Sequence, residues 1–247
     1  MIEALIFDVD GTLAETEEAH RQSFNAAFAE FGLGWVWDEA LYRSLLRVTG
    51  GKERIRHFVA MTGALQGGAD IGGAELAVAL HQKKTAIYVE MVRQGAVGLR
   101  PGIGEFLDAA ARAGLDLAIA TTTSLPNVET LLTAALGSRW RQMFVAIAAG
   151  DMAPNKKPAP DIYHLALALL GRHAGNCLAI EDSRNGVQSA LAAGLKVVAV
   201  RSVYTNGDDL SGAICQLPDC TGLSLQLLQE IAHGGDLDPA RLEQATR

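Results

Sequence analysis

The sequence predicts an α/β fold in which a parallel sheet forms the core and a helical domain is inserted into it. Short apolar runs of strand length recur along the chain, and the segments between the last four runs are rich in alanine and leucine, as helices are. Alternating strands and helices favour a parallel, Rossmann-like sheet that is covered on both faces. The expected strands are 4–7, 115–120, 144–148, 177–180 and 196–200.

The segment 183–200 shows how a helix and a strand follow each other. Ser183 can cap a helix, the alanine-rich stretch 187–193 continues it, and Gly194 ends it. The apolar run that follows Gly194 is the next strand. This order of start and stop signals supports the α/β prediction.

The long segment between the first two runs breaks the alternation. It has no strand-like run from 12 to 99, its pattern is helical, and turn signals occur at 32–34 and 50–51. We expect a helical cap domain at 17–97 and a core domain built from 1–16 and 98–247. The sequence Arg-Pro-Gly at 100–102 is expected to be the hinge where the chain returns to the core.

Composition and charge restrict the possible classes of function. The chain of 247 residues is 49% hydrophobic and 20% charged, and its net charge of −7 argues against nonspecific binding to nucleic acid or anionic membranes. The three cysteines are an odd number without a Cys-x-x-Cys pair, which favours a reducing compartment. No apolar stretch reaches the about 18 residues that span a bilayer. We therefore expect a cytoplasmic protein, and we expect it to be a monomer.

Paired acids follow the first expected strand. Asp8 and Asp10 are two residues apart, so on an extended chain their carboxylates project to the same side. Two like charges held together are costly unless a cation or a proton relieves them, and Mg²⁺ is suited to such oxygen ligands. Gly11 then allows a tight turn. The alternative is an ordinary surface turn of the Asp-x-Asp-Gly type.

A second pair of acids follows the fourth expected strand. Glu181 and Asp182 come directly after a buried apolar run, where acids are unexpected unless they face a cation. The alternative is that Asp182 only begins or caps the next helix.

Hydroxyl groups and a lysine follow two other strands. Four hydroxyl residues at 121–124 precede a helix start near Pro126, and hydroxyls and helix N-terminal amides both suit an anion. Lys157, in the loop after the third strand, can neutralise phosphate charge. Threonines are also common in strands, and Lys157 can be part of an exposed basic loop. Because parallel sheets bind ligands at the carboxyl ends of their strands, we expect all these groups to meet in one crevice.

Taken together, these motifs resemble those of the haloacid dehalogenase superfamily. The first motif of that family is Asp-x-Asp-Gly-Thr, which reads 8–12 here. The hydroxyl of the second motif falls at Thr122, the lysine of the third at Lys157, and the acids of the fourth at Glu181 and Asp182. The insert resembles the helical cap of the subgroup that contains beta-phosphoglucomutase and the CbbY-type sugar-bisphosphate phosphatases. The likeness covers nearly the whole chain.

The resemblance implies a Mg²⁺-dependent phosphatase. Asp8 would attack phosphorus and become an aspartyl phosphate, while Asp10 would act as the general acid and base. In the family the backbone carbonyl of the residue at position 10 meets the metal. The implied metal ligands are Asp8, Asp10, Asp182 and Glu181, and the implied phosphate-binding residues are Thr122, Thr123 and Lys157. The choice of Thr122 carries a register uncertainty of one residue, since threonines flank it.

The expected cap carries a concentrated positive charge. The stretch 41–58 holds five lysines and arginines against one acid, Glu53, in a chain of net negative charge. We hypothesise that part of it binds a second phosphate, so that the substrate is a bisphosphate. The alternative is a solvated helix face. The expected substrate-binding residues are Glu17, His20, Tyr42, Arg47, Gly51, Lys52 and Arg54.

Other functions fit the sequence less well. A phosphomutase would use the same core and Asp8, but Thr12 follows the phosphatase pattern of the family. A nucleotide-binding oxidoreductase fails at the only Gly-x-Gly, 102–104, because Leu107 stands where the third glycine is needed. The likeness to CbbY-type enzymes, which remove sugar bisphosphates that inhibit Rubisco of the Calvin cycle, makes xylulose 1,5-bisphosphate the expected substrate.

Overall fold

A single parallel sheet of six strands forms the centre of the protein. The computed structural model describes residues 2–64 and 73–232, and the sheet has the order β3-β2-β1-β4-β5-β6. The five predicted strands are present, and the α/β prediction is confirmed. A sixth strand was not predicted. The strands are β1 (Ala4–Phe7), β2 (Asp116–Thr121), β3 (Phe144–Ala149), β4 (Cys177–Glu181), β5 (Lys196–Val200) and β6 (Cys215–Leu217).

The two faces of the sheet differ in the size of their side chains. Successive residues of a strand point to opposite faces, so one face receives large residues such as Leu5 and Phe7. The other face receives mostly alanine, as at Ala118 and Ala120, which lets helices pack closely against it. Helices α5 (Ile103–Arg112), α6 (Leu125–Leu136) and α10 (Leu225–Ala232) pack on the large-residue face, with the short α7 (Trp140–Met143) beside them. Helices α8 (Asp161–Leu170) and α9 (Arg184–Ala192) pack on the alanine face.

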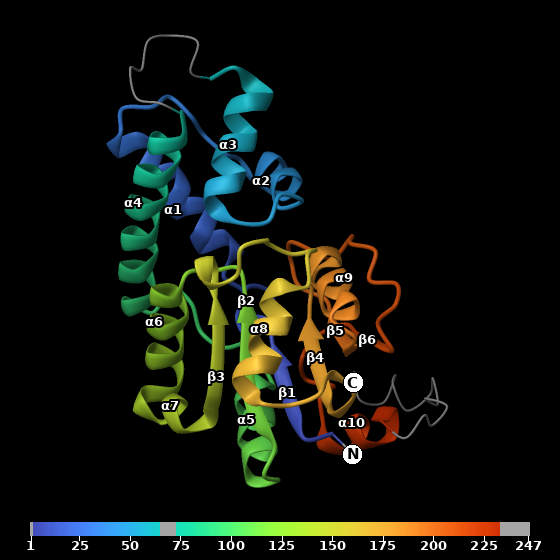
Figure 1. Ribbon diagram of the computed structural model, residues 1–247. Helices are drawn as coiled ribbons and strands as arrows, with labels where there is room; N and C mark the ends of the chain where they lie inside the picture. Colours follow the sequence, from blue (N-terminus) through green and yellow to red (C-terminus); the bar gives the residue numbers. More distant parts are fainter. Residues whose placement is uncertain (1, 65–72, 233–247) are drawn as a thin grey trace.

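Four further helices stand beyond the carboxyl ends of the strands (Figure 1). An aromatic cluster holds them together: the ring of Trp37 lies 4.7 Å from that of Phe24 and 5.5 Å from that of Phe58, measured between centroids. We call this group the cap helices. They are α1 (Glu17–Glu30), α2 (Glu39–Leu45), α3 (Gly51–Thr62) and α4 (Gly73–Arg93).

The ends of α1 and α4 nearest the sheet also belong to the core of the sheet. Ala19, Tyr88 and Val92 are buried in the same cluster as Leu5 and Phe7. The cap helices are therefore continuous with the layer below them, and the domain limits at 17 and 97 stay a prediction. The C-terminal residues 233–247 of the expected core domain lie outside the described residues.

The two connections to the cap helices run side by side. Ala14 pairs with Leu99 as an isolated antiparallel bridge, and the Arg100 backbone amide donates to the Leu13 carbonyl at 2.9 Å. The buried guanidinium of Arg100 also donates to the carbonyls of Gly11 and Arg201. The expected return hinge is thus bonded directly to the loop that follows β1.

Local signals explain how the strand ends are shaped. Ser183 Oγ accepts a hydrogen bond from the Gly186 amide at 3.1 Å, which caps α9 as predicted. Gly194 has a φ of 80°, a conformation that favours glycine, and β5 follows it. Helix α9 therefore begins two residues after Asp182, which directly follows β4.

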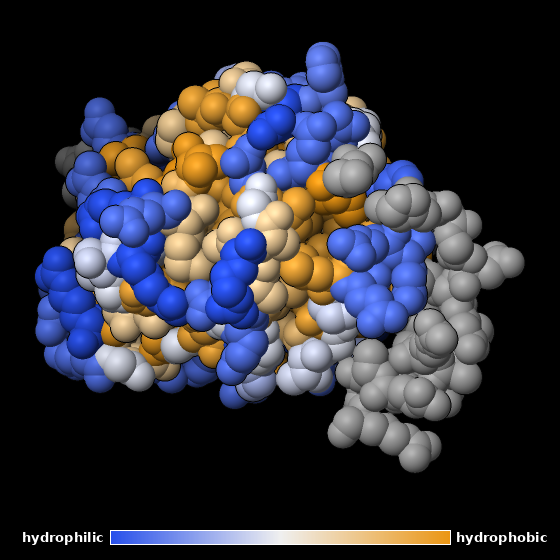
Figure 2. All heavy atoms as spheres, turned by 90° about the horizontal axis from the view of Figure 1, so that it is seen from below, coloured by the Kyte–Doolittle hydropathy of each residue, from blue (hydrophilic) through white to orange (hydrophobic). Residues whose placement is uncertain are grey.

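The end of the molecule opposite the cap helices has a mixed surface (Figure 2). Hydrophobic residues gather in the middle of this face, and hydrophilic residues surround them. Across residues 2–64 and 73–232, every helix is too short or too polar to cross a membrane.

Candidate active site

The three central strands bring the predicted acids together. Phe7 of β1 is level with Ile119 of β2 and with Ile180 of β4, so the residues that follow these positions emerge at one edge of the sheet. The Asp8 amide donates to the Ile180 carbonyl at 3.0 Å, which fixes Asp8 directly beside the end of β4. The residues that follow β1 and β4 therefore meet at this edge of the sheet.

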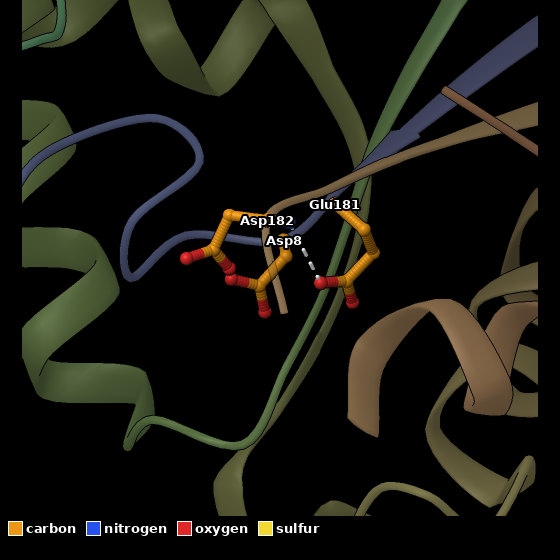
Figure 3. A group of neighbouring side chains, drawn as sticks. All are labelled: Asp8, Glu181 and Asp182. Atoms are coloured by element: carbon orange, nitrogen blue, oxygen red, sulfur yellow. Dashed lines mark hydrogen bonds between the residues drawn. The ribbon is translucent and has the colours of Figure 1, made fainter. Parts of the chain in front are cut away.

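Three buried carboxyl groups form a cluster there (Figure 3). One oxygen from each of Asp8, Glu181 and Asp182 lies within 4.8 Å of the others. Burial raises the pKa of Asp8 and of Asp182, and the neighbouring acids raise both pKa values further. A divalent cation would remove this repulsion, and hard oxygen ligands are what Mg²⁺ prefers. The residues present therefore fit a magnesium ion.

Lys157 lies between two of these acids. Its Nζ is 2.6 Å from Asp8 Oδ1 and 2.6 Å from Glu181 Oε1. Burial favours the neutral amine, but the two carboxylates outweigh it and raise the pKa of Lys157. Lys157 therefore remains charged beside the predicted nucleophile.

Glu181 is held from behind. Its side chain is fully buried, and its Oε1 also accepts a hydrogen bond from the Tyr163 hydroxyl at 2.6 Å. A Cβ on Gly186 would come 1.9 Å from Glu181 Oε2, so glycine is required there. Glu181 is therefore fixed in place, and it in turn positions Lys157.

Asp10 has a separate set of partners. Its Oδ1 accepts from Thr16 Oγ1 at 2.6 Å and lies 3.1 Å from His20 Nε2. Lys84 Nζ lies 2.7 Å from His20 Nδ1, so the ring proton of His20 is on Nε2 and points to Asp10. Although burial acts in the opposite direction, His20, Thr16 and Lys84 lower the pKa of Asp10 to about 2. Asp10 is therefore ionised in this state.

A cavity of about 740 Å³ opens between the strand ends and the cap helices. Most of the predicted residues line it. These are Asp8, Asp10, Asp182, Thr122, Thr123, Lys157, Glu17, His20, Arg47, Gly51 and Arg54. The predicted acids, hydroxyls and cap residues thus share one space, of the size that small ligands occupy.

Three predicted residues lie outside the cavity wall. Glu181 is fully buried and is bonded to Lys157. The Tyr42 hydroxyl donates to Glu17 Oε2 at 2.7 Å and accepts from Arg54 Nη1 at 3.0 Å, so Tyr42 supports two wall residues. Lys52 Nζ is paired with Asp151 Oδ2 at 2.5 Å. The roles assigned to all the site residues stay predictions.

The sequence agrees with the geometry. Residues 2–194 match the family described as haloacid dehalogenase-like hydrolase. The chain is a haloacid dehalogenase-like hydrolase. The resemblance to the haloacid dehalogenase superfamily is confirmed, and so is the prediction that the chain is an enzyme, a phosphatase.

The hydrolase has close relatives. It is 50% identical over 230 residues to Protein CbbY of Rhodobacter capsulatus, a match that covers 93% of this chain and 99% of the relative. It is also 50% identical over 218 residues to the plasmid Protein CbbY of Cupriavidus necator, covering 88% and 85%. These relatives confirm the expected CbbY-type subgroup.

Solved structures give the same result. A mutant of CbbY from Rhodobacter sphaeroides, in complex with xylulose-(1,5)bisphosphate, has a TM-score of 0.82 and 47% identity, over 89% of this chain and 95% of that one. CbbY from the same organism in complex with phosphate has a TM-score of 0.81 and 45% identity, over 98% and 100%. Beta-phosphoglucomutase from Clostridium difficile, with 22% identity and a TM-score of 0.78 over 95% and 98%, shares the fold.

Several residues of the hydrolase that line the cavity were not predicted. Lys84 and His81 come from the middle of α4, and their spacing carries no local signal. Arg184 and Asn185 begin α9, for which the sequence predicted only the cap at Ser183. Tyr204 belongs to the loop after β5. The packing of α4 on the strand ends brings Lys84 and His81 to the site, whereas Arg184, Asn185 and Tyr204 follow the ends of β4 and β5.

Proposed function

We propose that this chain is a Mg²⁺-dependent phosphatase that hydrolyses a small sugar bisphosphate, with xylulose 1,5-bisphosphate as the first candidate, through an aspartyl phosphate on Asp8. The observation that carries the proposal is the mixed lining of one cavity. It is lined by Asp8, Asp10 and Lys157 from the strand ends, and also by arginines from the cap helices and from the start of α9. A molecule with two phosphates would use both groups, one phosphate at the strand ends and one at the arginines.

Asp8 is the nucleophile in this proposal. Its carboxylate oxygen attacks phosphorus, the bond from phosphorus to the sugar oxygen breaks, and the phosphoryl group is left on Asp8. Lys157 at 2.6 Å holds Asp8 Oδ1 in place and neutralises charge as the phosphate approaches. Mg²⁺, bound by Asp8 and Asp182 with the Asp10 carbonyl, would supply further neutralisation of the phosphate oxygens.

Asp10 is the general acid and base. It carries no proton in the state described, because its partners hold its pKa low. A phosphate dianion beside it would raise that pKa, so the substrate itself favours the protonated form that donates to the leaving oxygen. In the second step Asp10 takes a proton from the water that attacks the aspartyl phosphate. Thr16 and His20 keep its carboxylate pointing into the cavity throughout.

The transferring phosphate has further donors at the end of β2. Thr122 and Thr123 line the cavity, and α6 begins just beyond them. Thr121 is buried, and its Oγ1 accepts from the Thr123 amide at 3.2 Å, which shapes the turn. We assign Thr122 and Thr123 to the transferring phosphate, together with Lys157.

The second phosphate would bind to the arginines. Within the described part of the chain, the guanidinium groups of Arg47 and Arg184 make no hydrogen bond or ion pair, although both residues line the cavity. Arg43 and Arg54 line it too, but they are bonded to Tyr204 and Tyr42 respectively. Arg47 and Arg184 therefore have donors to spare for an anion.

The sugar is proposed from the relatives. The CbbY mutant whose structure contains xylulose-(1,5)bisphosphate is 47% identical to this chain. A role in removing such a bisphosphate in cells that use the Calvin cycle follows from the same likeness. Location in the cytoplasm and the monomeric state stay predictions.

The test is phosphate release from a matched panel. The purified protein is incubated with xylulose 1,5-bisphosphate, the corresponding monophosphates and glucose phosphates, with Mg²⁺ or with EDTA, and the sugar products are identified. We expect phosphate release that requires Mg²⁺ and is fastest with the bisphosphate. Isomerisation of a sugar monophosphate without phosphate release would instead establish a mutase and contradict the proposal.

A further inference from the structure

The loop after β5 grips one of the predicted metal ligands. Ser202 Oγ donates to Asp182 Oδ2 at 2.7 Å, and Thr205 Oγ1 lies 2.8 Å from the same oxygen and 2.9 Å from the Asp182 carbonyl. The two hydroxyls are 2.7 Å apart. Since Oδ2 is occupied in this way, the rotation of the Asp182 carboxylate is fixed and its other oxygen is left for a cation.

The two residues between these hydroxyls face the opposite way, toward the cap helices. Arg43 Nη1 of α2 donates to the carbonyls of Val203 and Tyr204, at 2.9 and 2.8 Å. The Tyr204 hydroxyl donates to Glu18 Oε2 of α1 at 2.5 Å. Loop 202–205 therefore has one pair of residues on Asp182 and one pair on the cap helices.

Tyr204 is the anchor of the second pair. It is 8% exposed and is the only described residue from outside the cap helices and their connections in the aromatic cluster defined above. Its ring meets the ring of Tyr42 edge to face at 5.8 Å, and the guanidinium of Arg43 lies 5.0 Å from its centroid. The cluster is thus completed only when the cap helices sit on this loop.

These contacts link the docking of the cap helices to the positioning of the Asp182 carboxylate. If the cap helices move away, the carbonyls of Val203 and Tyr204 lose Arg43, and the Tyr204 side chain loses Glu18 and Tyr42. No helix or strand includes this four-residue segment. A less restrained loop presents Ser202 and Thr205 to Asp182 for a smaller fraction of the time. Loop 202–205 then has a restrained and a less restrained arrangement. Docking of the cap helices and binding of a cation at Asp182 both favour the restrained one, which is the physical requirement for coupling between two sites.

We propose that Tyr204 is a positioning residue: docking of the cap helices on Tyr204 holds Ser202 and Thr205 against Asp182 and so favours Mg²⁺ binding. This inference rests on the proposed metal-dependent function. By reciprocity, Mg²⁺ bound at Asp182 favours the docked cap. The cation and the closed cavity thereby stabilise each other before the sugar reacts.

The test measures binding of Mg²⁺ alone to the full chain by isothermal titration calorimetry, without substrate. Removal of the anchor in Tyr204→Ala should weaken Mg²⁺ binding by about fivefold or more, a typical size for coupling between sites. Tyr204→Phe keeps the ring in the cluster and should retain most of the affinity. Equal losses in both variants would contradict the role of ring packing.

Two further variants separate positioning from general stability. Phe58→Leu weakens the same aromatic cluster without touching the loop, so it should lower the melting temperature and leave the Mg²⁺ affinity unchanged. Thr205→Val should weaken Mg²⁺ binding. Adding Tyr204→Ala to it should lower the Mg²⁺ affinity little further, because Tyr204 acts through Thr205 and Ser202. An additive double variant, or a loss in Phe58→Leu that matches Tyr204→Ala, would overturn the inference.

The experiment also distinguishes the inference from the function on which it rests. A wild-type chain that does not bind Mg²⁺ contradicts the proposed function. If the wild type and Tyr204→Ala bind Mg²⁺ equally tightly, only the coupling is contradicted. If Tyr204→Ala does not fold, Arg43→Ala removes the other anchor from an exposed position and should show the same loss.

Discussion

Lys84 Nζ lies 2.7 Å from His20 Nδ1, and both side chains are buried between α1 and α4. Aromatic rings surround the ammonium group, with Phe24 at 4.9 Å and Tyr88 at 5.2 Å from Nζ to the ring centroid. No carboxylate bonds to it directly among the described residues, and Asp10 is reached only through His20. A lysine in this position is costly for folding and makes sense as part of the site.

Replacing this lysine should stabilise the protein and impair the enzyme. Burial lowers the pKa of Lys84 to about 7, well below its value in an unfolded chain. Between these two pKa values the unfolded state binds more protons, so the contribution of Lys84 opposes folding at pH 7 and fades as the pH rises. Lys84→Met should therefore raise the melting temperature at pH 7 by about 3 °C or more, at a lower kcat.

Thermal unfolding of both proteins at several pH values tests this. The difference in melting temperature should shrink steadily from pH 7 to pH 10. A variant that melts below the wild type at pH 7, or a difference that does not change with pH, would show that Lys84 is not a strained charge.

His20 should matter through Asp10. His20→Asn removes the hydrogen bond to Asp10 Oδ1 and breaks the connection to Lys84, so we expect kcat to fall by about a hundredfold, the lower range for general acid–base effects. His57→Asn, at an exposed position of α3, is the matched control and should leave kcat unchanged. The pH profile of kcat is the measurement, and an unaltered profile in His20→Asn would remove His20 from the account.

Discrimination between substrates should depend on Arg47. Arg47→Ala removes an unpaired guanidinium from the cavity wall and should raise KM for a bisphosphate by about tenfold, with little effect on a monophosphate. Arg56→Ala is the control, because Arg56 is an exposed arginine of α3 that does not line the cavity. Steady-state kinetics on both substrates give the answer, and equal changes in KM for the two would exclude a second phosphate site at Arg47.

Two glycines should respond oppositely to alanine. At Gly186 the new Cβ would meet the fully buried carboxylate of Glu181, so Gly186→Ala should destabilise the fold by about 1–3 kcal/mol, as overpacking does, and disturb Lys157. Gly104 lies in α5 with open space around it, and Gly104→Ala should stabilise the fold by about 0.5–1 kcal/mol. Urea unfolding compares them. A neutral Gly186→Ala would mean that Glu181 is not held as tightly as described.

The sequence indicated the chemistry at the strand ends because strand and helix signals are local. The acids at 8, 10 and 182 lie next to apolar runs. Because parallel strands expose their carboxyl ends at one edge of the sheet, these acids could be predicted to lie close together. Strand β6 escaped prediction because three residues carry too little periodicity. Lys84 and Tyr204 escaped it for another reason: their roles depend on how the cap helices pack on the sheet, which no local pattern records.

The central claim is that Asp8 accepts the phosphoryl group, and phosphate release by Asp8→Asn tests it most directly. The amide keeps the size of the side chain but removes the attacking oxygen anion, so with Mg²⁺ and the best bisphosphate the rate should fall by at least about a thousandfold in a protein that still folds. An Asp8→Asn protein that releases phosphate at a rate close to that of the wild type would contradict the account.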